Sequence, residues 1–338
     1  MKRTKGMLLF LMVVLWLAGC GNNQQIFSEE TESEKVRQDE DSIVVGIVQI
    51  GSESDWRAAN TQSFKRVFTE ENGYTLLFED GQQKQENQLK ALRNFILMDV
   101  DYIVLAPIVE TGWDAVLQEA ADADIPVLLV DRMVDVEDDS LWTCWVGTDF
   151  EQEGRDAGEW LVSYLEKQGR SGDPINIVTL QGTAGSTAQL GRTKGFAEVM
   201  ETQNTWTMLD ARDADFTQAK GREVMEAYLE RYPDIDVVVS ENDNMAFGAI
   251  AAIEDAGKTC GPDGEIIMIS FDAVRAAFEA MIDGKLNVSV ECNPLHGEKI
   301  AEVIQQLERG ETPEKIIYVD GEVFSAETAA QYLDSRMY

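Results

Sequence analysis

Polar side chains follow the ends of several short apolar runs in this 338-residue chain, and their types suit hydrogen bonding to hydroxyl groups. Asp131 and Arg132 follow the run IPVLLV, Asn242 lies two residues after DVVVS, and Asp272 lies two residues after EIIMIS. A carboxylate accepts, and a guanidinium donates, two hydrogen bonds in one plane, which matches a pair of neighbouring hydroxyls. Asp131 and Arg132 alone would also fit a structural ion pair, but Asn242 and Asp272 at equivalent strand ends favour a binding site.

Further polar and aromatic residues stand at similar places along the chain. The apolar faces of a sugar ring pack on aromatic side chains, so Trp56 is a candidate stacking platform, with the alternative that it anchors its own helix. Asp80 has the alternative of capping the helix that follows it. Carboxylates, an amide, guanidiniums and an aromatic at one edge would form a polar site suited to a sugar. The strand-end candidates are Glu53, Trp56, Arg57, Asp80, Asp131, Arg132, Arg192, Asn242, Asp272 and Glu291.

The elements that would bring these side chains together alternate along the chain. Apolar runs of roughly four to eight residues, separated by helical segments, predict a parallel sheet with helices on both faces. In such sheets the ligand lies at the carboxyl ends of the strands. The same βαβαβ plan restarts near residue 175. The predicted strands are 43–50, a run ending at Asp80, 101–106, 125–130, 142–147, 175–181, 206–210, 236–240, 265–270, 286–291 and 316–324.

This plan predicts an α/β fold of two Rossmann-like parallel-sheet lobes, joined by a multi-strand hinge with a ligand cleft between them. We expect an N-terminal lobe of residues 43–148 plus 292–320 and a C-terminal lobe of residues 149–291 plus 321–338. The chain would then cross between the lobes three times, which favours closure by rigid-body rotation. Thr148 lies at the first predicted crossing and joins the candidate binding residues.

Charge and composition exclude some classes of function. The formal net charge is −34, and such a surface repels DNA, RNA and anionic lipid head groups, so no nucleic acid partner is expected. His296 is the only histidine, which leaves little material for zinc sites or histidine-based triads. No metal and no cofactor are therefore expected. Three cysteines are expected to be small buried hydrophobic residues, namely Cys144, Cys260 and Cys292.

The first forty residues indicate a targeting segment. Three of residues 2–5 are basic, residues 7–17 are apolar, and the sequence LAGC ends at Cys20. The apolar run is shorter than the ~20 residues that span a membrane, and LAGC resembles a bacterial lipobox. We predict a lipoprotein signal peptide over 1–20, lipidation of Cys20 and a disordered acidic tether over 21–42. A signal anchor and a buried first helix are the alternatives.

Several longer motifs carry a resemblance to one family. The segments GSESDWRAAN, DGQQKQENQLKALRNF, APIVETGWDAVLQEA, LQGTAGSTAQLGRTKGFAE and NDNMAFGAIAAI are similar to those of type I periplasmic sugar-binding proteins, the ribose/galactose-binding class of ABC importers. They look most like the galactofuranose-binding member of that class, from residue 43 to about 325. The resemblance implies the periplasmic binding protein type I fold and a sugar ligand.

The resemblance also implies roles for individual residues. The positions that match the family's binding motif are Glu53, Trp56, Asp131, Arg132, Arg192, Phe216, Asn242 and Asp272, with Arg57 directly after Trp56. Glu291 falls where ribose-binding relatives carry a glutamine, and because a carboxylate only accepts hydrogen bonds, ribose is disfavoured.

Two features depart from the family. The predicted lipid anchor would replace the free periplasmic state and suggests a cell without a closed periplasm, such as a Gram-positive bacterium. The segment 135–150 is rich in tryptophan and would line the cleft differently.

Together these features predict an extracytoplasmic solute-binding lipoprotein, anchored to the cell membrane through Cys20. It would capture a monosaccharide, galactofuranose or a related hexose or pentose, and deliver it as a monomer to the transmembrane subunits of an ABC permease. The alternative is a sugar-sensing lipoprotein that docks on a membrane histidine kinase or chemoreceptor. An enzyme is not expected, because Asp131 and Asp272 should be held ionised by arginine and asparagine partners, and no acid is set up for a raised pKa.

Overall fold

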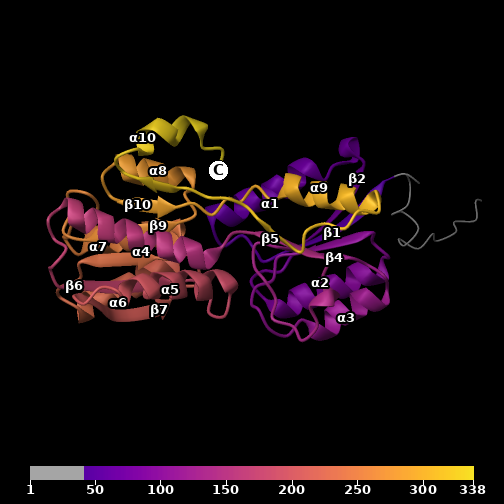
Figure 1. The fold of residues 1–338 in the computed structure, drawn as a ribbon, viewed down its shortest axis with the longest axis horizontal. Helices are drawn as coiled ribbons and strands as arrows, with labels where there is room; N and C mark the ends of the chain where they lie inside the picture. Colours follow the sequence, from indigo (N-terminus) through magenta and orange to yellow (C-terminus); the bar gives the residue numbers. More distant parts are fainter. Residues whose placement is uncertain (1–41) are drawn as a thin grey trace, which may run out of the picture. The chain divides into compact units, whose positions relative to one another are not determined.

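Two six-stranded sheets flanked by helices form the described part of the chain, residues 42–338, in the computed structural model (Figure 1). The predicted signal peptide, the lipidation of Cys20 and all but the last residue of the predicted tether lie outside the described residues. Within residues 42–338, no helix combines the length and the apolar character that crossing a membrane requires.

The first sheet has the strand order β11-β5-β4-β3-β1-β2, and all neighbouring strands are parallel. Helices α1 (Asp55–Val67) and α9 (Gly297–Glu308) cover one face, and α2 (Gln85–Leu97) and α3 (Asp114–Asp122) cover the other (Figure 1). The strands are β1 (Ile43–Gln49), β2 (Tyr74–Asp80), β3 (Tyr102–Leu105), β4 (Val127–Val130), β5 (Cys144–Gly147) and β11 (Ile316–Tyr318). β3 and β4 are buried along their whole length, as expected for apolar strands between two helix layers.

The second sheet repeats this plan with the order β12-β10-β9-β8-β6-β7. Its strands are β6 (Ile175–Gln181), β7 (Trp206–Asp213), β8 (Val237–Ser240), β9 (Ile267–Phe271), β10 (Val288–Val290) and β12 (Val323–Ser325). Its helices are α4 (Phe150–Lys167), α5 (Thr187–Met200), α6 (Gln218–Arg231), α7 (Asp243–Asp255), α8 (Arg275–Ile282) and α10 (Ala329–Tyr332). Short 3₁₀ helices cover Glu70–Asn72, Asp139–Leu141 and Leu333–Ser335.

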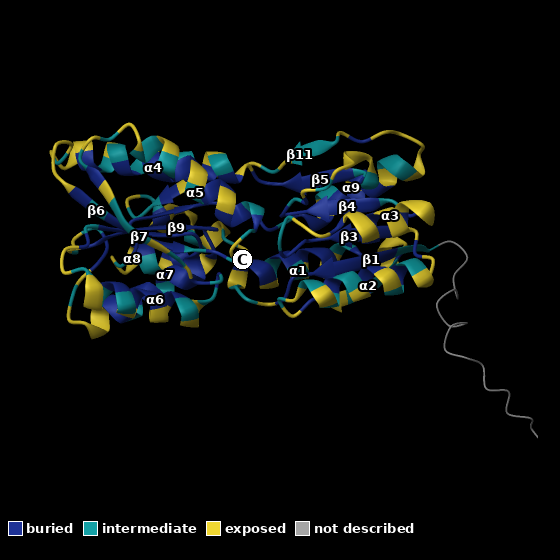
Figure 2. Ribbon diagram, turned by 90° about the horizontal axis from the view of Figure 1, so that it is seen from below, coloured by how far each residue is buried: buried dark blue, intermediate teal, exposed yellow. Residues whose placement is uncertain are grey.

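Burial follows these layers. Figure 2 shows buried strands in both sheets and exposed residues on the outer sides of the helices. One apolar cluster fills the first sheet and its helices, while two clusters fill the opposite faces of the second sheet. The predicted burial of the three cysteines is confirmed, and Cys144, Cys260 and Cys292 are free thiols.

The predicted α/β fold class with two parallel-sheet lobes is confirmed, with one correction near the end of the chain. The predicted single strand over 316–324 is wrong, because β11 belongs to the first sheet and β12 to the second. β12 also pairs antiparallel with β10. The chain leaves the first sheet at this point and passes Gly321, where a Cβ atom would lie only 2.2 Å from the Glu291 carbonyl oxygen.

The chain passes between the two sheets three times within the described residues. The crossings follow β5, β10 and β11 and lead into α4, α9 and β12 respectively. We refer to each sheet with its flanking helices as a lobe, so that the N-terminal lobe contains the first sheet and the C-terminal lobe contains the second sheet.

Gly321→Ala should destabilise the protein, because the added methyl group meets backbone that has little room to move at a crossing. We expect a loss of about 1–3 kcal/mol in the free energy of unfolding, measured by urea denaturation. Gly172→Ala is the matched control, since a Cβ there meets no atom within 4 Å. Equal stability of the two variants would contradict the close approach at Gly321.

Candidate ligand-binding site

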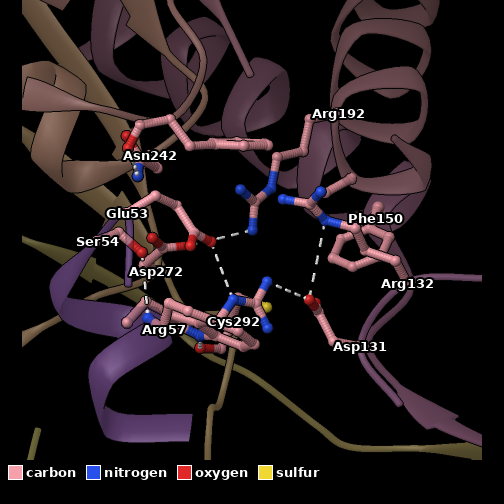
Figure 3. A pocket seen from close by; sticks show the side chains of 13 residues that line it. Glu53, Ser54, Arg57, Asp131, Arg132, Phe150, Arg192, Asn242, Asp272 and Cys292 are labelled. Carbon is pink, nitrogen blue, oxygen red and sulfur yellow. Dashed lines mark hydrogen bonds and ion pairs between the residues drawn. The ribbon is translucent and has the colours of Figure 1, made fainter. Parts of the chain in front are cut away.

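A cavity with about 290 Å³ of empty space, open solvent at its mouth included, lies where the carboxyl ends of strands from both sheets meet (Figure 3). Both lobes contribute to its wall, and the N-terminal lobe supplies one set of charged groups while the C-terminal lobe supplies another. The lining residues are Glu53, Ser54, Trp56, Arg57, Asp131, Arg132, Phe150, Ala188, Arg192, Phe216, Asn242, Asp272 and Cys292.

The N-terminal lobe builds its side of the cavity around Arg57. Ser54 caps helix α1 by accepting a hydrogen bond from the Arg57 backbone N–H, which places Arg57 in the first turn. The Arg57 guanidinium donates to Glu53 Oε1 at 2.9 Å and to Asp131 Oδ2 at 2.5 Å. Burial alone would raise the pKa of Asp131, but the charges of Arg57 and Arg132 hold that pKa below its usual value. Asp131 is therefore an ionised hydrogen-bond acceptor inside the cavity wall.

The C-terminal lobe builds its side around Arg192, on helix α5. Its Nε donates to Glu153 Oε2 at 2.7 Å, and one terminal nitrogen donates to Asp272 Oδ1 at 3.2 Å. The rings of Phe150 and Phe271 pack against the guanidinium, with centroids 5.5 and 4.9 Å from its central carbon. These contacts fix the plane of the guanidinium, so its donors point in set directions.

Asn242 caps helix α7 and also lines the cavity. Its side-chain oxygen accepts from the Met245 backbone N–H at 2.9 Å, and its amide nitrogen donates to the Phe216 carbonyl oxygen at 3.1 Å. An amide has four hydrogen-bonding positions, so one acceptor position and one donor position remain for a ligand.

Aromatic side chains form the apolar part of the wall. The Trp56 indole N–H donates to the Cys292 carbonyl oxygen at 2.5 Å, which ties its ring to the second crossing. Phe216 lies under the Arg132 guanidinium at 5.1 Å, a contact that joins the two lobes. Both rings are almost completely buried. Aromatic faces beside hydrogen-bonding groups suit a ring that has both apolar faces and polar edges.

Two buried polar atoms of the lining residues have no hydrogen-bond partner among the described residues, namely Glu53 Oε2 and Arg132 Nε. One is an acceptor and the other is a donor. A buried polar group without a partner costs free energy, so both atoms indicate a ligand that accepts and donates hydrogen bonds, as a hydroxyl group does.

Three cavity residues other than glycine have a left-handed backbone. Their φ angles are 63° at Asp131, 57° at Phe216 and 99° at Asp272. This conformation is uncommon for residues with a side chain and clusters at functional sites. At Asp131, the backbone N–H donates to the Val146 carbonyl and the Trp145 indole donates to the Asp131 carbonyl, and both bonds hold the turn in place.

The structure places nine of the twelve predicted binding residues around the cavity and leaves three outside it. Asp80 is exposed and accepts from the Gln82 backbone N–H, so it shapes a turn and does not cap α2. Thr148 is buried at the first crossing, with its hydroxyl 3.6 Å from the Cys292 sulfur. Glu291 faces the carboxy-terminal segment, where its carboxylate contacts the Arg336 guanidinium and the Tyr338 hydroxyl.

Four lining residues were not predicted, namely Ser54, Phe150, Ala188 and Cys292. Ser54 carries the only local signal, since serine before a helical segment is a typical N-cap. The tryptophan-rich segment 135–150 does not line the cavity with its tryptophans, because Trp142 and Trp145 are buried in the N-terminal lobe.

The expectation that no acid has a raised pKa is wrong. Burial raises the pKa of Asp272, and the nearby carboxylates of Asp243 and Glu153 add to this rise, while Arg192 opposes it. Burial likewise raises the pKa of Glu153 to about 7 and that of Glu241 to about 8. The single guanidinium of Arg192 opposes the rise in pKa of all three buried carboxylates.

A ligand cavity between two hinged α/β lobes defines a class of solute-binding proteins. Residues 45–312 match the family described as periplasmic binding protein domain, and the chain belongs to this family. The family consists of extracytoplasmic solute-binding proteins and not of enzymes. The predicted resemblance to type I periplasmic sugar-binding proteins is thereby confirmed.

Relatives with a stated ligand share most of their length with this chain. The galactofuranose-binding protein YtfQ of Escherichia coli (strain K12) is 41% identical over 298 residues, which cover 87% of this chain and 91% of the relative. A Mycobacterium smegmatis protein solved in complex with β-D-fucofuranose is 41% identical with a TM-score of 0.84, covering 88% of this chain and 96% of that one. The binding component of the arabinose ABC transporter from Shewanella sp. ANA-3, bound to α- and β-L-arabinofuranose, is 41% identical with a TM-score of 0.81, covering 87% and 95%.

The buried Glu241 should make stability depend on pH. A pKa of about 8 in the folded state, against the usual value near 4.5, means that the folded state binds this proton more tightly than the unfolded state. The stabilisation that this proton gives is fully present below the pKa of Glu241 in the unfolded state. It is lost as the pH rises through about 8, and the free energy of unfolding falls by up to ~1.4 kcal/mol per pH unit. Glu241→Gln should therefore flatten the fall in the free energy of unfolding between about pH 5 and pH 8.

Urea denaturation at several pH values measures this effect. Glu166→Gln, at an exposed position of α4, is the control and should keep the wild-type slope. If the free energy of unfolding falls equally with pH in Glu241→Gln and in the wild type, Glu241 is not the group that binds a proton more tightly in the folded state.

Proposed function

We propose that this chain is an extracytoplasmic solute-binding lipoprotein that captures a monosaccharide in its furanose form and hands it to an ABC permease. Galactofuranose or a related hexose or pentose is the proposed ligand. The observation that carries the proposal is the buried cavity between the lobes, in which paired carboxylates and guanidiniums stand beside aromatic rings.

The charge balance of the cavity supports a neutral ligand. Arg57 and Arg192 are each paired with two carboxylates, and Arg132 lies within 3.9 Å of Asp131 and donates to the Ile108 carbonyl oxygen at 2.7 Å. Two of the three lining guanidiniums are therefore hydrogen-bonded to carboxylates, while Arg132 keeps a free donor at Nε. The unpartnered Glu53 Oε2 and Arg132 Nε fit an uncharged molecule with several hydroxyl groups.

The relatives support the furanose form. Galactofuranose, β-D-fucofuranose and L-arabinofuranose are the ligands in the names of three proteins that are 41% identical to this chain. Five-membered rings are common to all three, while the substituents differ. We therefore propose that the site selects mainly for the furanose ring form, and that the ring substituents affect binding less.

The delivery step rests on the family and on the sequence LAGC, which ends at Cys20. Relatives of this chain are named as fructose and ribose import binding proteins, and an acylated cysteine would keep the loaded protein near a permease. A sensing role with a membrane histidine kinase or chemoreceptor is the alternative. Uptake of labelled sugar that depends on this chain supports import, while sugar-dependent gene expression without uptake supports sensing.

Asp131→Ala and Asp272→Ala should each weaken sugar binding by at least tenfold. Each change removes an acceptor and leaves part of a buried guanidinium without a partner, at about 1.5–3 kcal/mol for a charged group. Calorimetry against a panel of galactofuranose, L-arabinose, D-fucose, D-ribose and D-fructose measures the affinities and identifies the sugar.

Asp80→Ala is the matched control, because this aspartate also follows a strand of the N-terminal lobe but lies outside the cavity. It should bind sugar like the wild type. Wild-type affinity in both Asp131→Ala and Asp272→Ala, with intact circular dichroism, would overturn the assignment of the cavity.

Cys20→Ser should release the protein from the membrane into the medium, because the proposed acyl chains would have no attachment point. Stable anchoring requires more than one acyl chain, as a single chain binds a bilayer only marginally. Labelled palmitate in cells expressing the wild type measures acylation, and absence of label at Cys20 would contradict the lipoprotein assignment.

A further inference from the structure

A completely buried asparagine, Asn60 of helix α1, lies behind the N-terminal wall of the sugar cavity and is not one of the residues that line it. Its side-chain nitrogen donates to the Pro294 carbonyl oxygen at 2.8 Å and lies 3.2 Å from His296 Nδ1. Its side-chain oxygen accepts from Gln49 Nε2 at 3.0 Å. Asn60 therefore joins helix α1 to the end of strand β1 and to the second crossing.

The directions of these hydrogen bonds are fixed by groups that cannot exchange roles. A backbone carbonyl only accepts, so the nitrogen of Asn60 must face Pro294 and its oxygen must face Gln49. The Gln49 nitrogen is then the donor to Asn60. The Gln49 oxygen is left to accept from Arg57 Nη1 at 3.2 Å and from the Ile50 backbone N–H at 2.9 Å. Both of these groups only donate, so neither amide can be reversed without losing hydrogen bonds.

The Gln49 arm of this network ends in the cavity. One terminal nitrogen of the Arg57 guanidinium donates to Gln49, and the other donates to Asp131 Oδ2 at 2.5 Å. The four residues from Asn60 to Asp131 along this arm are at most 3% exposed. A buried polar network whose members all have partners is rigid, because each displaced group would be left unpaired. The orientation of the Arg57 guanidinium is therefore set from Pro294 through two amides.

The His296 arm ends at the aromatic part of the wall. Because the Asn60 nitrogen donates, His296 Nδ1 must accept, and the neutral ring then carries its proton on Nε2. Burial lowers the pKa of His296 to about 4, so the ring is neutral near pH 7. The ring stands edge-on to Trp56, with centroids 5.9 Å apart. One amide thus contacts the supports of both the charged and the aromatic side chains of this wall.

We infer that Asn60 is a positioning residue of the sugar site, which orients Arg57 through Gln49 and Trp56 through His296. The inference rests on the proposed function, since it concerns the same cavity. Asn60 acts through these side chains and does not itself touch the ligand. Because Pro294 belongs to the second crossing, the orientation of the cavity wall depends on the segment that links the lobes.

Asn60→Leu and Gln49→Leu test the positioning role, because each keeps a side chain of similar size and removes the hydrogen bonds. The probes are D-galactose and L-arabinose, whose solutions contain the furanose forms. Each variant should weaken the sugar binding of the wild type at least about tenfold in calorimetry, since groups of the cavity wall lose their fixed orientation. Circular dichroism checks the folding of both variants.

Ser63→Ala is the matched control. Ser63 is also buried on α1 and also holds the returning chain, because its hydroxyl accepts from the Gly297 backbone N–H at 2.9 Å, but it lies outside the network of Asn60. The variant should lower the free energy of unfolding and keep the sugar affinity within about twofold. Equal losses of affinity in Ser63→Ala and Asn60→Leu would show that attachment of α1 alone matters, which overturns the positioning role.

His296 supplies a second measurement, because it is the only histidine of the chain. In protein without a histidine tag, ¹⁵N NMR should show a neutral ring with its proton on Nε2 between about pH 5.5 and pH 8. Asn60→Leu removes the donor to Nδ1 and should give a mixture of both neutral forms. A wild-type ring protonated on Nδ1 would overturn the assigned directions of the bonds, even if Asn60→Leu fails to fold.

The outcomes separate this inference from the proposed function. If the wild type binds none of the sugars tested by calorimetry, the proposed function is wrong, and the inference fails with it. If the wild type binds sugar and the folded Asn60→Leu and Gln49→Leu variants bind it within about twofold as well, the positioning role alone is wrong.

Discussion

Buried guanidiniums paired with carboxylates allow a polar cavity to exist between two apolar lobes. An unpaired charge in such a place would cost several kcal/mol, whereas a paired and hydrogen-bonded charge is tolerated. Arg57 joins Glu53 to Asp131 in the N-terminal lobe, and Arg192 joins Glu153 to Asp272 in the C-terminal lobe. Because each side chain is held by its partners, the hydrogen-bonding directions in the cavity exist before any ligand arrives, which lowers the entropy lost on binding.

The same network reaches the second crossing. In helix α1, the Trp56 indole donates to the Cys292 carbonyl, the Asn60 amide donates to the Pro294 carbonyl at 2.8 Å, and the Ser63 hydroxyl accepts from the Gly297 backbone N–H at 2.9 Å. Successive turns of α1 therefore fasten the returning chain to the N-terminal lobe.

The fold class and most of the residues that line the cavity could be predicted from the sequence. Apolar runs marked the strands, and parallel strands bring their carboxyl ends to one edge, so Asp131, Asn242 and Asp272 were predictable from position alone. Glu291 also follows a strand, but its direction depends on the distant Arg336 and Tyr338, which no local pattern reveals. The raised pKa of Asp272 was missed for a similar reason, since Asp243 and Glu153 approach it from two different helices.

The left-handed backbone at Asp131 and Asp272 narrows the set of amino acids that these positions accept. Aspartate, asparagine and glycine adopt positive φ angles most readily, whereas β-branched and bulky residues are strained there. If sugar specificity changed in evolution through substitutions at these two positions, the accepted residues would be aspartate, asparagine or glycine. The ligand would then meet a carboxylate, an amide or the backbone alone. Diversification of the ligand would then fall mainly on neighbours with ordinary backbone, such as Phe150 and Ala188, whose size can vary without disturbing the strand ends.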